Sequence, residues 1–280
     1  MLQRVLHMEL KGKIAVITGG ASGIGSAVCR QLAAENVKVI GVVDQIENLA
    51  EICTAANREL GGELMIPFQG DVVDSSFRER VFTDMEKRFG AVTLCVPAAG
   101  IIRDRLSVKV HKDNGWVTPN IYSETDFRRV IDVDLIAPIY WAMRTVASVA
   151  IDRAKRGLRA WRPEESVQGA IILIGSISSA GNRGQISYAT AKAGLEGAQA
   201  TLAKEAIYYG VRCAIIHPGF TDTPMVRALG EEMIREQILP NTQLQRLIRP
   251  SEIAGAIIFM LKNSAVSGTL WADAGWHPQA

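Results

Sequence analysis

The chain has 280 residues, of which 48% are hydrophobic and 21% charged, which allows a sizeable buried core and excludes a disordered chain. The formal net charge of +2 gives no reason to expect a nucleic-acid partner, and no apolar run approaches the roughly 20 residues that span a membrane. The cysteines form no Cys-x-x-Cys pair, so we expect no zinc, no disulfide framework and a reducing cytoplasm. They are Cys29, Cys53, Cys95 and Cys213.

A domain start is predicted at Met8. The preceding residues and the segment up to Lys13 carry scattered charge and lack the apolar core of a signal peptide. We therefore expect Met8 to be the natural initiator, residues 1–7 to be an N-terminal extension, and residues 8–280 to form a single domain without repeats or linkers.

Short runs rich in Val and Ile alternate with segments of helical periodicity along the chain. Strands are predicted at Ile14–Thr18, Val37–Val43, Glu63–Gln69, Val92–Val96, Ala170–Ile174, Arg212–Ile216 and Thr269–Ala272. Helices are predicted at Ile24–Asn36, Leu49–Leu60, Ser75–Phe89, Thr125–Val149, Ile186–Tyr209 and Pro250–Leu261. Continuous apolar strands separated by helices indicate a parallel sheet buried on both faces. We predict an α/β fold, a doubly wound sheet of seven mainly parallel strands that binds ligands at the carboxyl ends of its strands.

Two segments interrupt this alternation, and a third follows the sixth strand. Ile101–Ser123 is interpreted as a polar loop. Arg153–Gln168, with five basic residues around Trp161, is interpreted as a solvated surface insertion that could alternatively dock an acidic partner. Asp222–Arg249 mixes apolar residues with paired charges, which predicts either helices over a partly apolar substrate pocket or an amphipathic helix packed on the body.

A glycine-rich segment, Thr18–Gly25, joins the first predicted strand to the first predicted helix. Glycines let backbone N–H groups approach a pyrophosphate, and a helix N-terminus favours its negative charge. Asp44 ends the second strand, where a carboxylate can accept hydrogen bonds from both ribose hydroxyls of NAD and would repel the 2′-phosphate of NADP. We therefore predict an NAD site, with NADP less favoured, although Asp44 could also be a loop carboxylate or a helix cap.

The residues after the third strand complete this prediction. Asp71 and Val72 could frame the adenine, and Asp71 could equally cap the following helix. The cofactor contacts predicted in these first three strand–helix units are Gly19, Ser22, Gly23, Ile24, Gly25, Asp44, Asp71 and Val72.

Tyr188 and Lys192 stand four residues apart on a predicted helix, so their side chains share one face. A phenol with a pKa of about 10 is a poor base at neutral pH, and a nearby ammonium lowers that pKa. Ser176 follows the fifth strand at the ligand-binding edge, where its hydroxyl could hold a carbonyl or alcohol oxygen beside the phenol. The three residues predict the interconversion of an alcohol and a carbonyl compound.

Together these motifs resemble the short-chain dehydrogenase/reductase family, classical type, from Met8 to Gly275. Thr18–Gly25 is similar to its T-G-x-x-x-G-x-G motif, and the Tyr188 to Lys192 segment to its Y-x-x-x-K motif. The resemblance implies a Rossmann-type sheet, hydride transfer at the nicotinamide, and a homo-oligomer, a tetramer or dimer, built on the long helices. The further cofactor contacts that it implies are Ala99, Gly100, Tyr188, Lys192, Pro218, Gly219, Thr221 and Thr223.

Three departures from the family pattern bear on the site. The N-N-A-G segment is P-A-A-G at residues 97–100, so the amides that brace that turn are missing. The family's active-site asparagine is Asp134, which loses the amide donor unless it is protonated, so we expect an altered pH dependence. Ser176 precedes Tyr188 by twelve residues instead of thirteen, which leaves Ser178 as an alternative catalytic serine.

We therefore predict an NAD(H)-dependent oxidoreductase that acts on small secondary alcohols and ketones, with no metal. A 3-oxoacyl thioester reductase and a catalytically silent NAD-binding redox sensor are the alternatives. His217 is expected to be a strand-end histidine near the cofactor. Trp271 and Trp276 are expected to pack at a subunit contact, or Trp276 to shield a turn.

Overall fold

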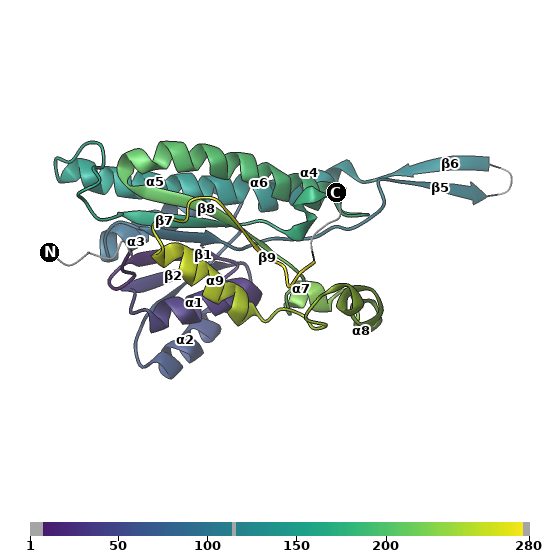
Figure 1. The fold of residues 1–280 in the computed structure, drawn as a ribbon, viewed down its shortest axis with the longest axis horizontal. Coiled ribbons are helices and arrows are strands. Elements are labelled where there is room, and N and C mark those ends of the chain that lie inside the picture. Colours follow the sequence, from purple (N-terminus) through teal and green to yellow (C-terminus); the bar gives the residue numbers. More distant parts are fainter. Residues whose placement is uncertain (1–7, 114–115, 277–280) are drawn as a thin grey trace.

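A parallel sheet of seven strands organises the computed structural model, which describes residues 8–113 and 116–276 (Figure 1). Residues 1–7, the predicted N-terminal extension, lie outside the described residues. The order of the strands across the sheet is β3-β2-β1-β4-β7-β8-β9, and every neighbouring pair is parallel. The strands are β1 (Ile14–Thr18), β2 (Val39–Asp44), β3 (Met65–Gln69), β4 (Leu94–Pro97), β7 (Gly169–Ile174), β8 (Val211–Pro218) and β9 (Thr269–Ala272).

Helices cover both faces of this sheet (Figure 1). The buried residues of each face form a separate cluster, one shared with α1, α2 and α9 and the other with α3, α5 and α6. The predicted doubly wound α/β sheet is therefore confirmed, with element ends within a few residues of the prediction. The helices are α1 (Gly23–Ala34), α2 (Leu49–Leu60), α3 (Ser75–Arg88), α4 (Glu124–Ile131), α5 (Ala137–Lys155), α6 (Ile186–Glu205) and α9 (Pro250–Lys262).

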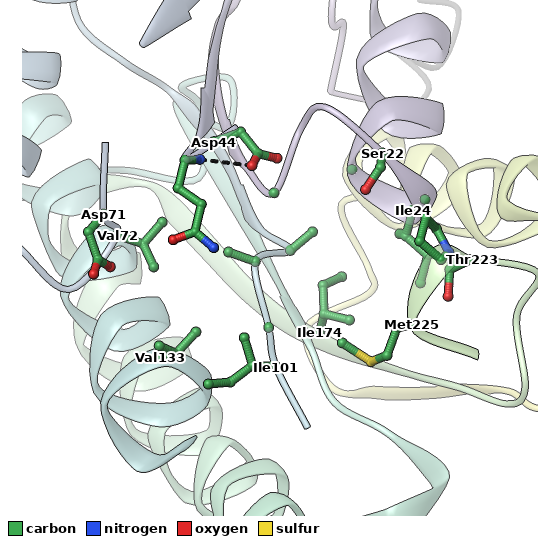
Figure 2. A pocket seen from close by; sticks show the side chains of 18 of the residues that line it. Ser22, Ile24, Asp44, Asp71, Val72, Ile101, Val133, Ile174, Thr223 and Met225 are labelled. Atoms are coloured by element: carbon green, nitrogen blue, oxygen red, sulfur yellow. Dashed lines mark hydrogen bonds between the residues drawn. The ribbon is translucent and has the colours of Figure 1, made fainter. Parts of the chain in front are cut away.

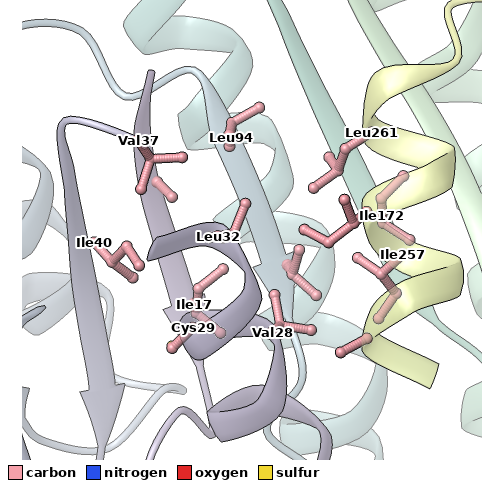
Figure 3. Packing of buried hydrophobic residues seen from close by; sticks show 14 of the residues in the cluster. Ile17, Val28, Cys29, Leu32, Val37, Ile40, Leu94, Ile172, Ile257 and Leu261 are labelled. Atoms are coloured by element: carbon pink, nitrogen blue, oxygen red, sulfur yellow. The ribbon is translucent and has the colours of Figure 1, made fainter. Parts of the chain in front are cut away.

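The packing of α1 and α9 on the sheet shows why the apolar pattern produces this arrangement (Figure 3). Val28 and Leu32 of α1 lie one helical turn apart, and Ile257 and Leu261 of α9 have the same spacing; none of the four is measurably exposed. Both pairs lie on the fully buried central strands. Complete burial of one such side chain contributes about 1.5–3 kcal/mol, so this face of the sheet is a major source of stability.

The direction of winding reverses between β1 and β4, which lie side by side in the sheet. The chain fills one half of the sheet from β1 through β3 and then crosses to β4 and the other half. A crevice opens at the carboxyl ends of the strands where such a reversal occurs, because the connecting segments diverge to opposite faces. The glycine-rich segment before α1 and the segment after β4 both lie at this point.

The predicted helix Thr125–Val149 is interrupted. A π-helical turn, Asp132–Ile136, separates α4 from α5. Because such a turn widens the helix by one residue, it changes which side chains face inward, and here it directs Asp134 into the protein. A regular 3.6-residue pattern does not reveal this.

The interpretation of Ile101–Ser123 as a polar loop is wrong. Val108–Asp113 and Trp116–Ile121 form an antiparallel hairpin, β5 and β6. Lysine, histidine and asparagine alternate with β-branched residues there, which is a strand pattern with period two. The polar residues and the proline concealed that pattern because every strand position is exposed, so no long apolar run marks the hairpin.

The insertion Arg153–Gln168 is mostly exposed, as predicted, and Arg153 is its one buried residue. The Arg153 side chain is 1% exposed and donates two hydrogen bonds to the Glu165 carboxylate, at 2.6 and 3.1 Å. The Trp161 amide donates to Tyr208 O at 2.8 Å, which ties the segment to the end of α6. Charge composition alone could not show this, because pairing depends on how the segment folds back.

Short helices follow β8, as predicted for Asp222–Arg249. They are α7 (Pro224–Arg227), α8 (Glu231–Met233), a π-helical turn at Ile234–Ile238 and a 3₁₀ turn at Leu239–Asn241. Within the described residues no helix is long and apolar enough to cross a membrane, and no three potential metal ligands cluster together.

Candidate active site

A pocket of about 320 Å³ opens at the carboxyl ends of the strands, where the winding reverses (Figure 2). Asp44, Asp71 and Val72 lie toward one side of it, and Ser22, Thr223 and Met225 toward the other. Thirteen predicted site residues line it: Gly19, Ser22, Gly23, Ile24, Gly25, Asp44, Asp71, Val72, Ala99, Gly100, Tyr188, Lys192 and Thr223.

Other lining residues were not predicted. Most of them come directly after a strand end or after a predicted residue. Their position next to a motif could therefore have identified them as pocket residues. These are Gln45, Gly70, Ala98, Ile101, Arg129, Val133, Ile174, Pro224 and Met225. Five predicted residues are not among the lining residues: Asp134, Ser176, Pro218, Gly219 and Thr221.

The glycine-rich segment packs so closely that it tolerates no side chains at two positions. A Cβ on Gly25 would overlap the carbonyl oxygen of Gly19, and a Cβ on Gly19 would lie 2.7 Å from the amide nitrogen of Ala99. Gly19 also has a positive φ of +64°, which favours glycine. Ser22, the N-cap of α1, forms no side-chain cap in the described structure. The Ser22 side chain thus leaves the start of α1 uncapped at the pocket wall, an arrangement that suits the phosphates of a pyrophosphate.

Asp44 is held at the end of β2 by main-chain donors. Its carboxylate accepts hydrogen bonds from the amides of Ala21, at 3.1 Å, and Gln45, at 2.8 Å. It does not cap α2, whose N-cap is Asn48. This position links the second strand to the glycine-rich segment and leaves the carboxylate at the pocket wall.

Asp71 does not cap the helix after β3, because Asp74 does so by accepting hydrogen bonds from the amides of Ser76 and Phe77. Instead, Asp71 forms an ion pair with Arg129 of α4, with 2.8 Å between the charged atoms. Both side chains are 40% exposed, so the pair closes one end of the pocket at the surface.

Tyr188, Lys192 and Ser176 meet at the wall formed by α6 and the end of β7. Lys192 Nζ lies 5.4 Å from the centre of the Tyr188 ring, and the Ser176 hydroxyl is near enough to the phenol to lower its pKa. Lys192 also donates a hydrogen bond to Ile174 O at 3.1 Å, which holds the ammonium under the phenol. Burial raises the pKa of Tyr188 above its ordinary value, and the charge of Lys192 opposes that rise.

Asp134 completes a buried ion pair behind these residues. Its Oδ1 accepts a hydrogen bond from the Ile101 amide at 2.9 Å, and its Oδ2 lies 3.5 Å from Lys192 Nζ. The side chain has no exposed surface. Burial raises the pKa of Asp134, and Lys192 opposes this by favouring the carboxylate. The site therefore places an ionisable carboxyl beside the lysine, where the family motif has a neutral amide.

Ser178, the alternative catalytic serine, points elsewhere. Its hydroxyl donates a hydrogen bond to Gln185 Oε1 at 2.7 Å, and Gln185 donates in turn to Asp104 at 2.7 Å. The Ser176 hydroxyl accepts a hydrogen bond from the Ser178 amide at 3.1 Å. Ser178 thus shapes the turn that presents Ser176.

His217 holds this turn through a hydrogen bond to the main chain of Ser176. It is fully buried in β8, and its Nδ1 accepts a hydrogen bond from the Ser176 amide at 3.2 Å. Its ring stacks on Trp271 with 4.4 Å between ring centres, and Gly175 leaves the space that the ring occupies. Trp276 packs on Phe220 with a ring separation of 4.6 Å, in the turn after β8. His217 therefore lies at the strand end, as predicted, and contacts the main chain of Ser176.

Known proteins match most of the length of this chain. The family model described as short chain dehydrogenase matches residues 13–234. The chain is 35% identical over 274 residues to the 3-oxoacyl-(acyl-carrier-protein) reductase FabG of Escherichia coli, covering 96% of this chain and 99% of that protein. It is 32% identical over 255 residues to the short-chain reductase protein NovJ of Streptomyces niveus, covering 89% and 87%. A solved short-chain type dehydrogenase/reductase from Mycobacterium marinum shares the fold, with a TM-score of 0.78 and 21% identity over 95% of this chain and 96% of that chain.

Proposed function

This chain belongs to the short-chain dehydrogenase family, and we propose that it is an NAD(H)-dependent enzyme that interconverts a secondary alcohol and a ketone. The family and its relatives make it an oxidoreductase that acts on CH–OH groups. The observation that carries the finer proposal is the arrangement of Tyr188 and Lys192 at the pocket wall, with Lys192 Nζ 5.4 Å from the centre of the phenol ring and Ser176 acting on the same phenol. We take residues 8–280 to act as a single catalytic domain.

Tyr188 is the proposed acid and base. Because burial raises the pKa of its phenol, the hydroxyl holds its proton at neutral pH and can donate it to a carbonyl oxygen during reduction. Ser176, which lowers the pKa of the phenol, would hold the same oxygen. In the oxidation direction, the Lys192 ammonium favours the phenolate that removes the proton of an alcohol.

A nicotinamide cofactor fits the remaining lining residues. When bound, it would supply or accept the hydride. The glycine-rich segment would hold its pyrophosphate, and Asp44 its adenosine ribose. Lys192 and Arg129 are the cations among the described residues that line the pocket, and Arg129 is paired with Asp71. The pocket near Asp44 thus offers the 2′-phosphate of NADP a carboxylate and no free cation, which favours NAD.

The proposal is tested by following absorbance at 340 nm with a panel of alcohols and ketones and both cofactors. Tyr188→Phe should lower kcat at least about 100-fold, because general acid–base catalysis contributes that much or more. Tyr208→Phe, at a tyrosine that is 54% exposed, is the matched control and should leave kcat unchanged. Turnover with NADP(H) alone would contradict the assignment of Asp44.

A second comparison decides which serine takes part. Ser176→Ala should lower kcat, since Ser176 acts on the phenol, and Ser178→Ala should affect it less. Full turnover of Ser176→Ala with loss in Ser178→Ala would contradict this assignment. Cofactor binding without turnover on any substrate would favour the silent redox sensor instead.

A 3-oxoacyl thioester is the second candidate substrate. The specific observation in its favour is the 35% identity to a 3-oxoacyl-(acyl-carrier-protein) reductase across 99% of that protein's length. The panel should therefore include a 3-oxoacyl thioester with each reduced cofactor. A kcat/KM for the thioester well above that for simple ketones would favour this candidate.

We also propose a cytoplasmic location. All four cysteines are free and buried, which suits a reducing compartment. Cell fractionation that finds the native protein outside the cytoplasm would contradict this.

A further inference from the structure

His217 is the next-to-last residue of β8 and lies beside the turn that carries Ser176. The regular ladder between β7 and β8 ends where the Gly175 amide donates a hydrogen bond to Ile216 O at 2.7 Å. Pro218, the last residue of β8, has no N–H group that would continue the ladder. The Ser176 amide donates instead to Nδ1 of His217, at 3.2 Å. A side chain therefore takes over where main-chain pairing stops.

The hydrogen bonds around His217 decide which ring nitrogen carries the proton. Burial lowers the pKa of His217, against the opposing effect of Glu196, so the ring is neutral at neutral pH and has one N–H. Ser176 O lies 3.0 Å from Nδ1, but it already accepts a hydrogen bond from the Ser179 hydroxyl, at 2.8 Å. Among the described residues, the Ser176 amide has no acceptor other than Nδ1. Nδ1 is therefore the unprotonated nitrogen, and Nε2 carries the proton.

Nε2 of His217 faces a carboxylate on α6. This nitrogen is buried and has no hydrogen-bond partner in the described part of the chain, and Glu196 Oε1 lies 3.6 Å from it. Glu196 follows Lys192 by four residues and Tyr188 by eight, so the three side chains share one face of the helix. Lys192 and Glu196 are the charged groups that act on the imidazole from α6. The negative charge of Glu196 favours the tautomer with the proton on Nε2.

The fold reserves a place for this ring. A Cβ on Gly175 would lie 2.5 Å from Nδ1, so a glycine is needed there for the imidazole to reach Ser176. Trp271 of β9 stacks on the ring with 19° between the two planes. A buried N–H without a hydrogen bond is less favourable than an apolar group of the same shape. Stability alone therefore does not explain a histidine at this position.

We propose that His217, held in one tautomer by Glu196, is a positioning residue that fixes the main chain of Ser176 and thereby the direction of its hydroxyl. This inference rests on the proposed function, in which that hydroxyl holds the reacting oxygen. The Ser176 hydroxyl accepts a hydrogen bond from the Ser178 amide at 3.1 Å, so its direction follows the local main chain. Because reacting groups must meet at near-contact distance, a small displacement of this hydroxyl lowers kcat.

The first test is nitrogen NMR of the wild-type protein with ¹⁵N-labelled histidine, which distinguishes protonated from unprotonated ring nitrogens. The His217 signals, identified by their loss in His217→Asn, should show a proton on Nε2 and none on Nδ1 at neutral pH. A proton on Nδ1, or a doubly protonated ring, would overturn the proposal. This readout needs no substrate. A wild type that turns over no alcohol or ketone would therefore count against the proposed function, and the tautomer would still decide this inference.

Two variants of matched shape separate positioning from packing. Leucine and asparagine branch at the same atom, but only asparagine can place an acceptor near the position of Nδ1. With the best substrate of the alcohol and ketone panel, His217→Leu should lower kcat at least about tenfold and leave the Kd for NADH unchanged. His217→Asn should regain most of the lost kcat. A purely structural role predicts the reverse order, because a buried leucine packs better than a buried asparagine. That order, or equal kcat values for both variants, would overturn the proposal.

Glu196→Ala removes the carboxylate at an exposed helix position and leaves His217 in place. It should lower kcat several-fold, and NMR should find the proton on Nδ1 in part of the molecules. Glu205→Ala, at another exposed carboxylate of α6, is the matched control and should keep the wild-type kcat and tautomer. Equal kcat values and equal tautomers for these two variants would overturn the role of Glu196.

Discussion

Asp134 offers the sharpest test of the proposed chemistry, because it places a carboxyl, which can carry a negative charge, where the family motif has a neutral amide. Its Oδ2 lies 3.5 Å from Lys192 Nζ, which lies 5.4 Å from the centre of the Tyr188 ring. The carboxylate is therefore at most about 9 Å from that ring centre, the sum of those two distances. At this distance and an effective dielectric constant of about 20, a unit charge opposes ionisation of the phenol by about 1.8 kcal/mol, which corresponds to at least about one pKa unit.

Asp134→Asn keeps the shape of the side chain and removes this charge. In the proposed mechanism alcohol oxidation uses the Tyr188 phenolate, so kcat should rise with pH as the phenol ionises. Without the carboxylate the phenolate forms more readily, and we expect the midpoint of that rise to move to lower pH by about one unit. Below both midpoints, oxidation by the variant should be about tenfold faster than by the wild type.

The assay is the kcat–pH profile of alcohol oxidation, followed at 340 nm. Asp132→Asn is the control, since it makes the same chemical change on the same π-helical turn at a residue that is not buried. It should leave the midpoint in place. An unchanged midpoint in Asp134→Asn would mean that Asp134 already carries a proton in this pH range, and a shift to higher pH would also refute the reasoning.

Two further variants and one labelling experiment test the fold and the pocket. Trp141→Ala should lower the free energy of unfolding by about 3–5 kcal/mol, because the side chain has no exposed surface, and denaturation showing a loss below about 1 kcal/mol would contradict this. Gly25→Ala should weaken NADH binding, measured by fluorescence titration, at least about tenfold, because its Cβ would overlap Gly19 O; an unchanged Kd would count against the proposed pyrophosphate site. Burial raises the pKa of Cys53 to about 11 and raises those of the other three cysteines too, so a thiol reagent should label the native protein slowly and the unfolded protein fully. Rapid labelling of the native chain would contradict their burial.

The order of the elements and most of the pocket could be predicted from local pattern. Strands buried on both faces require continuous apolar runs, and the segments between them show helical spacing, so the doubly wound sheet follows from the sequence. Glycines at residues 19–25 and Asp44 at a strand end are recognisable because the chemistry of a dinucleotide site demands those residue types at those places. Tyr188 and Lys192 are recognisable for the same reason, since spacing by four on a helix places them together.

The sequence by itself therefore determined the features that depend on neighbours along the chain. These are the periodicity of apolar residues, the glycine-rich turn, and the spacing of Tyr188 and Lys192. What only the tertiary structure decided depends on residues far apart in sequence. Asp134 meets Lys192 because a π-helical turn directs it inward, and Arg153 is buried because the chain folds back to bring Glu165 to it. The hairpin of β5 and β6 was not predicted, because strands that are exposed on both faces contain no apolar run. Ion pairs and exposed hairpins depend on packing between residues far apart in the sequence. The local pattern of residues contains little information about that packing.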